Sequence, residues 1–100
     1  MAISSIVAAE LEVGIHKFFR PEIQRARLSL LYARLRIDSF DEAAARHCGE
    51  IRADLEKKGT LIGPLDLLIA AHARSLGATL ITANVGEFRR VKGLKVLVWK

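Results

Sequence analysis

Helical segments alternate with short apolar runs along this chain, and the alternation limits the folds open to it. The sequence predicts strands at residues 3–6, 36–40, 78–82 and 94–99, helices at residues 7–19, 22–35, 42–58 and 65–76, and a loop or single helical turn at residues 86–90. Such an order predicts an α/β fold with a mainly parallel sheet. Helices are plentiful for the number of strands, which indicates that a strand is missing.

Several helix ends carry local signals. Asp41 suits the N-cap of the helix at residues 42–58, and Gly59 suits the position just after its end. Pro64 suits the first position of the next helix, because its fixed φ angle matches a helix and its missing N–H would be unpaired there anyway. These signals make the middle of the chain the part whose secondary structure is easiest to predict.

The composition favours one globular domain. The chain has 100 residues, of which 51% are hydrophobic and 27% charged. No apolar run approaches the roughly 20 residues needed to cross a bilayer. The first 14 residues lack a basic leader and include Glu10 and Glu12, which argues against a secretory signal. The single cysteine, Cys48, cannot form an internal disulfide, so we expect a cytoplasmic protein with a buried or half-buried thiol.

The net charge of +5 is compatible with a nucleic-acid partner and equally with an acidic protein partner. Five arginines concentrate over one region: Arg20, Arg25, Arg27, Arg34 and Arg36. They would form either a surface for an RNA backbone or an ordinary solvated helix face. Both interpretations stay open.

Asp66 is the first candidate for chemistry. It lies at about the third position of a helix that is otherwise apolar, where the helix dipole favours a negative charge. Hard divalent metal ions need ionised carboxylates as ligands. The alternative is a first-turn acid that only helps the helix to begin.

Glu10 is the second candidate, because it lies about one turn after a strand, and sites in open α/β sheets form beyond the carboxyl ends of strands. The alternative is a solvated surface glutamate, since surface acids are common. Asn84 and Glu87 follow the strand at residues 78–82, and their alternative is turn chemistry. Thr82 would either bond a nearby carboxylate or phosphate or serve only as a β-branched strand residue.

Other sites are not indicated. His16, His47 and His72 have no histidine partner at helical spacing, and a cysteine pair is lacking, so the sequence contains no zinc motif. His72 is expected to be a hydrogen-bonded core residue. Neither a phosphate-binding loop nor a dinucleotide fingerprint is present.

Residues 63–73, which read Gly-Pro-Leu-Asp-Leu-Leu-Ile-Ala-Ala-His-Ala, strongly resemble the third acidic motif of PIN-domain ribonucleases of the VapC toxin family. Leu65 departs mildly, because many members carry Asn there. Residues 3–11 resemble the second motif, which runs from a strand into the helix with the signature glutamate. Residues 77–84, followed by Glu87 and Phe88, resemble the fourth motif. The likeness covers essentially the whole chain.

The resemblance implies a three-layer α/β/α fold and an endoribonuclease that depends on Mg²⁺ or Mn²⁺. It also implies a homodimer and a cognate VapB-type antitoxin whose tail lies across the active site. By position, Glu10 and Asp66 would be metal-site carboxylates, and Asn84 would stand where many members have a fourth acid. Glu87 would be a substitute or outer ligand, and Thr82 a supporting hydroxyl.

The chain departs from the family pattern at its start. Members begin with a central strand ending in an aspartate, close to Asp-Thr-Asn, and a helix, whereas this chain begins at the second motif. We therefore expect residues 1–100 to be a partial PIN domain without the first strand and helix, with weak metal binding, poor stability and little activity. Met1 would be a wrongly assigned start, or the chain a truncated remnant.

Three functions follow from these observations. The first is an RNA-cleaving toxin whose true start lies upstream. The second is a non-catalytic PIN remnant that dimerises or binds an antitoxin. The third, a small basic DNA-binding helical domain, fits the charge but does not explain the strands at residues 78–82 and 94–99.

Overall fold

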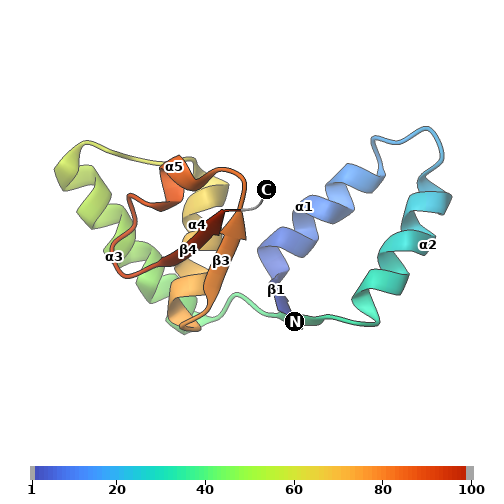
Figure 1. Ribbon diagram of the computed structural model, residues 1–100, viewed down its shortest axis with the longest axis horizontal. Helices are drawn as coiled ribbons and strands as arrows, with labels where there is room; N and C mark the ends of the chain where they lie inside the picture. The colour runs from blue at the N-terminus through green and yellow to red at the C-terminus, as the bar shows by residue number, and fades with distance from the viewer. Residues whose placement is uncertain (1, 99–100) are drawn as a thin grey trace. The chain divides into compact units, whose positions relative to one another are not determined.

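The computed structural model describes residues 2–98, and the chain divides into two compact units (Figure 1). Unit 1 runs to Ser39 and unit 2 begins at Phe40. The α/β class and the parallel pairing predicted from sequence are confirmed, and the described strands form two parallel sheets of two strands each. The prediction of one partial domain over residues 1–100 stays a prediction.

Unit 1 contains a two-stranded sheet and a pair of helices. Its elements are β1 (Ala2–Ser4), α1 (Ser5–Ile15), α2 (Pro21–Tyr32) and β2 (Arg36–Asp38). Strand β1 pairs with β2 in parallel, with Ile3 opposite Ile37. Parallel strands need a long crossover between them, and α1 and α2 provide it.

Helix α1 begins and ends earlier than the sequence suggests. The Ser4 side chain accepts a hydrogen bond from the backbone N–H of Ile6 at 3.0 Å, so it caps the helix and the strand stops at Ser4. After Ile15 the backbone turns tighter, with Phe18 N–H donating to the Ile15 carbonyl at 3.2 Å. Such three-residue bonds close a helix. The predicted helix end at Phe19 is therefore wrong.

Unit 2 contains the longest helix and the second sheet. Its elements are α3 (Glu42–Lys58), α4 (Pro64–Ser75), β3 (Thr79–Thr82), α5 (Val85–Phe88) and β4 (Lys95–Val98). Strand β3 pairs with β4 in parallel, with Ile81 opposite Leu97. The predicted strand end at Trp99 and the interpretation of Met1 lie outside the described residues.

The end signals of α3 and α4 are confirmed. The Asp41 side chain accepts a hydrogen bond from the backbone N–H of Ala44 at 3.0 Å. Gly59 takes the left-handed conformation with φ of 67°. This conformation is unfavourable for any residue that has a Cβ atom, so glycine suits the position. Pro64 is the first residue of α4. Each of these signals acts on neighbours a few residues away, so the helix ends can be predicted from the sequence alone.

The core of unit 2 forms where α3 packs on α4. Its buried members are Ile51, Leu55, Leu67, Ala70, Ala71, Phe88 and Val91. Full burial of a large apolar side chain contributes about 1.5–3 kcal/mol. His72 is 1% exposed and lies edge-to-face with Phe40, their rings 5.5 Å apart, so its predicted core position is confirmed. Cys48 is half-buried against this core, also as predicted.

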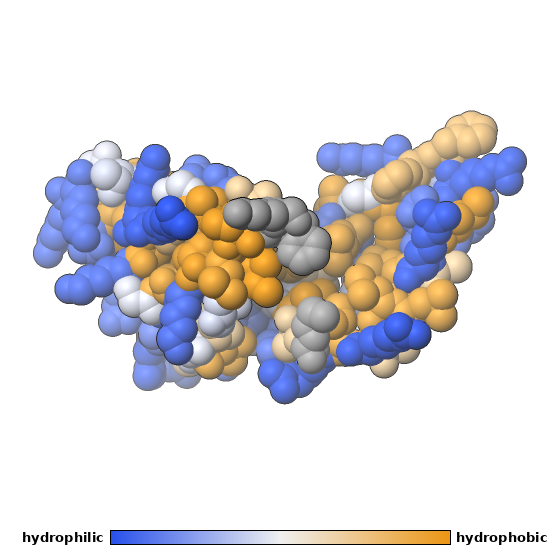
Figure 2. Space-filling view, viewed as in Figure 1, coloured by the Kyte–Doolittle hydropathy of each residue, from blue (hydrophilic) through white to orange (hydrophobic). Residues whose placement is uncertain are grey.

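Unit 1 keeps more apolar surface exposed. Its exposed large apolar side chains are Leu11, Val13, Phe18, Phe19, Ile23, Leu30, Leu31 and Ile37. Hydrophobic surface on α1 and α2 lies next to hydrophilic side chains in Figure 2. Among the described residues, no helix is both long enough and apolar enough to cross a membrane.

Candidate functional site

Asp66 lies in the first turn of α4, as the sequence predicts. Its Oδ2 atom is 3.8 Å from the place where a Cβ atom on Gly63 would lie. The half-buried carboxylate therefore folds back over the start of the helix, where unpaired backbone N–H groups and the helix dipole favour a negative charge. An acid in this position can offer its oxygen atoms as metal ligands at the N-terminal end of α4.

The end of β3 carries three further candidates. Thr82 is the last residue of the strand, and its Oγ1 atom accepts a hydrogen bond from the Asn84 backbone N–H at 3.0 Å. This bond shapes the turn into α5, so the turn chemistry considered for Asn84 is present. The Thr82 hydroxyl keeps its own proton for donation. Asn84 is exposed and Glu87, in α5, is half-buried.

The topology brings these candidates to one end of unit 2. After α4 the chain reverses at Gly77, which has a φ of 64°, and the Ala78 N–H donates to the Ala73 carbonyl at 3.0 Å. Strand β3 then runs back along α4 (Figure 1). The end of β3 and the start of α4 therefore share one end of the unit, which is where α/β sheets form sites.

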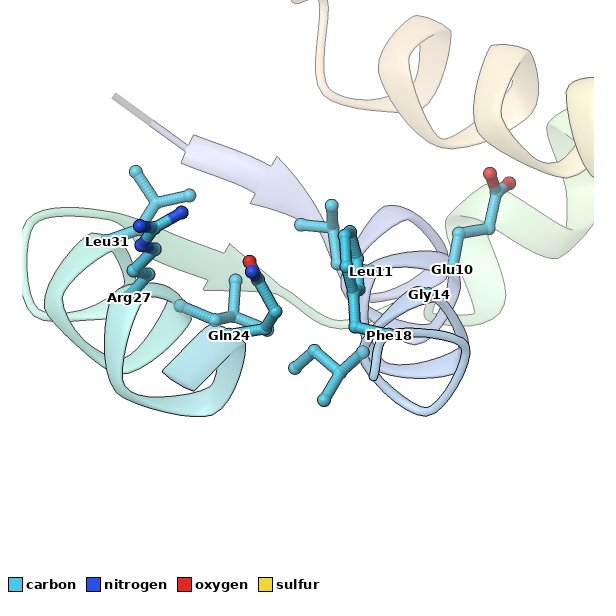
Figure 3. Close-up of a pocket in the computed structure, with 9 residues that line it drawn as sticks. Glu10, Leu11, Gly14, Phe18, Gln24, Arg27 and Leu31 are labelled. Carbon is cyan, nitrogen blue, oxygen red and sulfur yellow. The ribbon is translucent and has the colours of Figure 1, made fainter. Parts of the chain in front are cut away.

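Glu10 lies on α1 in unit 1 and is exposed. Figure 3 shows its carboxylate on the side of α1 that turns away from α2. Within residues 2–98, Glu10 makes no ion pair with another side chain, in contrast to Glu12 two residues further on. Its carboxylate is accordingly not engaged by the basic side chains of its own unit.

A groove of about 320 Å³ lies between α1 and α2. Its lining is mostly apolar and comprises Leu11, Gly14, Ile15, Phe18, Leu28 and Leu31, with Glu10, Gln24 and Arg27 as the polar members. In Figure 3, Leu11 and Phe18 lie on the side of α1 that faces α2. The predicted site residues do not include this groove. A signal was present, because apolar side chains surround Glu10 and Glu12 on α1 and exceed what one buried face requires.

The arginine cluster is partly neutralised by acids. Arg25 Nη1 lies 2.8 Å from Glu12 Oε2, and the Tyr32 hydroxyl donates to the same oxygen at 3.4 Å. The hydrogen bond from Arg25 holds the pKa of Glu12 below its usual value, and burial raises the pKa of Tyr32. Arg36 pairs with Asp38 at 2.8 Å. The five arginines therefore do not form one continuous free cationic surface.

The candidate metal ligands have suitable chemistry and come from both units. Asp66 and Glu87 are carboxylates of unit 2, and Glu10 is a carboxylate of unit 1. Carboxylate and amide oxygens are the ligands that Mg²⁺ and Mn²⁺ prefer. Within residues 2–98 there is no group of three or more histidine, cysteine, aspartate or glutamate side chains that could hold a metal ion.

Comparison with known families and structures identifies relatives of this chain. Residues 1–94 match the model of the PIN domain. Over 99 residues the chain is 43% identical to ribonuclease VapC2 of Rickettsia felis, covering 99% of this chain and 74% of that protein. It is 42% identical over 99 residues to the tRNA(fMet)-specific endonuclease VapC of Salmonella typhimurium, covering 99% and 75%.

Solved structures agree with the sequence matches. The crystal structure of VapBC2 from Rickettsia felis bound to a promoter DNA fragment matches with a TM-score of 0.94 and 43% identity, covering 99% of this chain and 74% of that chain. DNA-bound VapBC from Salmonella typhimurium matches with a TM-score of 0.95 and 42% identity, covering 100% and 76%. The chain therefore belongs to the PIN domain family, and within it to the VapC ribonucleases.

Proposed function

We propose that this chain is the toxin of a VapBC-type toxin–antitoxin pair and hydrolyses RNA phosphodiester bonds with Mg²⁺ or Mn²⁺. One observation carries the proposal: Asp66 lies in the first turn of α4, at the end of unit 2 where β3 stops. It is supported by 43% identity to a ribonuclease over nearly the whole chain. A carboxylate at that place is suited to a hard divalent ion.

Glu10 and Asp66 are the proposed metal ligands, and Glu87 is a further carboxylate that can join them. All three offer oxygen atoms, so the set suits Mg²⁺ or Mn²⁺ better than zinc, which favours nitrogen and sulfur. When bound, such an ion activates water and offsets negative charge on the phosphate. With so few carboxylates, we expect weak binding that relies on water for the remaining ligands.

Thr82 and Asn84 are proposed to position the substrate. The Asn84 N–H bond to Thr82 Oγ1, at 3.0 Å, fixes the turn at the end of β3. The hydroxyl proton of Thr82 and the side-chain amide of Asn84 can each donate to a phosphate oxygen. A turn held in this way orients donors at little entropic cost.

The test is RNA cleavage by wild type and by Asp66→Asn, with Asp54→Asn as the matched control. Asp54 is an acid of α3 paired with Lys58 at 3.0 Å. We expect Asp66→Asn to lower the cleavage rate by about a hundredfold or more, because the transition state loses a metal ligand. Asp54→Asn should cleave like wild type. Undiminished cleavage by Asp66→Asn, or by wild type in excess chelator, would contradict the proposal.

We further propose a VapB-type antitoxin as partner and a homodimer as the assembly. The structures of relatives are VapBC complexes, which supports the antitoxin. The apolar groove between α1 and α2 also favours the second candidate function, a non-catalytic antitoxin-binding or dimerisation module. Copurification with an antitoxin, without RNA cleavage in Mg²⁺ or Mn²⁺, would favour the module over the enzyme.

A further inference from the structure

We infer that the loop at residues 16–20 is an RNA-contacting element, in which Phe19 stacks on an unpaired base while Lys17 and Arg20 bind the adjoining phosphates. This aromatic–basic loop, His16-Lys17-Phe18-Phe19-Arg20, joins α1 to α2. The inference rests on the proposed ribonuclease function, because it names residues of unit 1 that would hold the same RNA.

The exposure of the two aromatic rings is the first reason. Phe19 is 94% exposed and Phe18 is 54% exposed. Single exposed apolar side chains are ordinary in proteins, but two adjacent rings on a five-residue loop are a concentrated apolar surface. Phe18 also borders the groove between α1 and α2, whereas Phe19 is not among the groove residues. Packing in unit 1 therefore gives no reason for a ring at position 19.

The backbone of the loop is held at both ends. Lys17 N–H donates to the Gly14 carbonyl at 3.1 Å, and Ile23 N–H donates to the Arg20 carbonyl at 3.2 Å. Pro21 then fixes φ at the first residue of α2. A short loop anchored in this way presents its side chains with little backbone entropy left to lose on binding.

The charge around the rings selects the partner. From residue 12 to residue 34 the sequence has five lysines and arginines against two acids, Glu12 and Glu22, and Glu12 pairs with Arg25. Lys17 and Arg20 make no ion pair with any residue of the described chain. Hydrophobic and hydrophilic surface lie next to each other over this helix pair in Figure 2. Aromatic rings next to unpaired Lys17 and Arg20 are suited to bind a nucleic acid, which offers phosphates and exposed bases together. They are less suited to bind an apolar protein surface, which offers no negative charge.

The chemistry also selects the form of the RNA. The major groove of an RNA duplex is deep and narrow, so a ring on a surface loop cannot reach paired bases. Unpaired bases in hairpin loops and bulges can splay out and stack on aromatic side chains. The aromatic–basic loop should therefore distinguish a hairpin with an unpaired loop from a continuous duplex.

The binding experiment uses the full chain carrying Asp66→Asn, so that RNA stays intact, and two fluorescent RNAs. One is a hairpin with a seven-nucleotide unpaired loop (about the size that leaves several bases free to splay out), and the other is a duplex of equal charge. We expect Phe19→Ala to weaken hairpin binding about tenfold and leave duplex binding unchanged. Phe19→Trp should retain hairpin binding. Leu30→Ala is the matched control, because Leu30 is 72% exposed on α2.

Two further measurements separate stacking from charge and from catalysis. Lys17→Gln and Arg20→Gln should each lower the slope of log Kd against log salt by about one. In the cleaving chain, Phe19→Ala should raise KM with kcat unchanged, as expected for a residue that binds but does not react.

The outcomes distinguish this inference from the proposed function. If wild type cleaves no RNA, the proposed function fails, while the binding experiment still decides the role of Phe19. If wild type cleaves and Phe19→Ala binds and cleaves the hairpin like Leu30→Ala, the inference is overturned. It is equally overturned if Phe19→Ala weakens only antitoxin binding, which would make the loop a protein-binding surface.

Discussion

Arg74 of α4 donates a hydrogen bond from Nε to Nδ1 of His47 on α3 at 2.8 Å. The same guanidinium donates from Nη1 to the Lys92 carbonyl at 3.0 Å and pairs with Glu50 at 3.2 Å. One side chain thus joins the two core helices of unit 2 to the turn that precedes β4. The planar fork of arginine makes this possible, because its donors point in several fixed directions.

Arg74→Lys should lower the free energy of unfolding by about 1–3 kcal/mol, because a lysine cannot make these three bonds at once. Urea unfolding followed by circular dichroism measures the change. Arg52→Lys is the control, since Arg52 pairs with Glu56 on the surface of α3 at 2.8 Å. It should shift the unfolding free energy by about 0.5 kcal/mol or less. Equal effects of the two substitutions would contradict the role given to Arg74.

Glu12 should titrate below its usual pKa of 4.5, because Arg25 donates a hydrogen bond to its carboxylate. The folded state favours the ionised form, so this stabilisation is present above the unfolded pKa and is lost as the pH falls through the lowered folded value. Arg25→Gln should raise the pKa of Glu12, as measured by NMR of its carboxyl carbon. Arg46→Gln, which removes a surface pair with Glu42 on α3, should leave the titration of Glu12 unchanged.

Two glycines of unit 2 should respond to alanine with opposite signs. Gly59 has a φ of 67° after α3, so Gly59→Ala should lower the free energy of unfolding by about 1–2 kcal/mol. Gly49 lies inside α3, and a Cβ atom there would meet no atom within 4 Å apart from its chain neighbours and the nearby backbone of its own helix. Gly49→Ala should therefore raise the unfolding free energy by about 0.5–1 kcal/mol. Thermal unfolding of both variants measures the difference, and changes of the same sign would refute the conformational argument.

Metal binding should be visible without any RNA. Millimolar Mg²⁺ or Mn²⁺ should raise the thermal unfolding midpoint of the wild type, because an ion that binds only the folded state stabilises it. The rise should disappear in Asp66→Asn and remain in Asp54→Asn, and excess chelator should reverse it. A rise that persists in Asp66→Asn would mean that the ion binds elsewhere.

Much of the secondary structure could be predicted because its causes are local. The bounds of α3 follow from Asp41, which bonds the Ala44 N–H, and from Gly59, which supplies the left-handed turn. The place of Asp66 in the first turn of α4 follows from Pro64 two residues earlier. The start of α1 differs from the predicted start although its cause is also local, because the Ser4 cap competes with the strand preference of the β-branched Ile6.

The candidate site could be predicted only residue by residue. A motif indicates that Asp66 begins a helix and that Asn84 follows a strand, and the structure places both at one end of unit 2. The Thr82–Asn84 hydrogen bond was foreseen only as turn chemistry in general. How many carboxylates share one ion depends on distances between segments far apart in the chain, and the sequence contains no pattern that fixes those distances.

The sequence by itself determined the family, because its motifs are read from residue types along the chain. It also determined the order of helices and strands and the capping of α3, because these depend on residue type and on neighbours within about four positions. Only the tertiary structure decided the register of β3 on β4, the groove between α1 and α2, and the bonds from Arg74 to His47 and Lys92. These features join residues separated by many positions. Their geometry forms only after the burial of apolar side chains has brought the segments together. The hydrophobic effect is strong but non-directional, so an apolar pattern in the sequence does not specify which distant residues will meet.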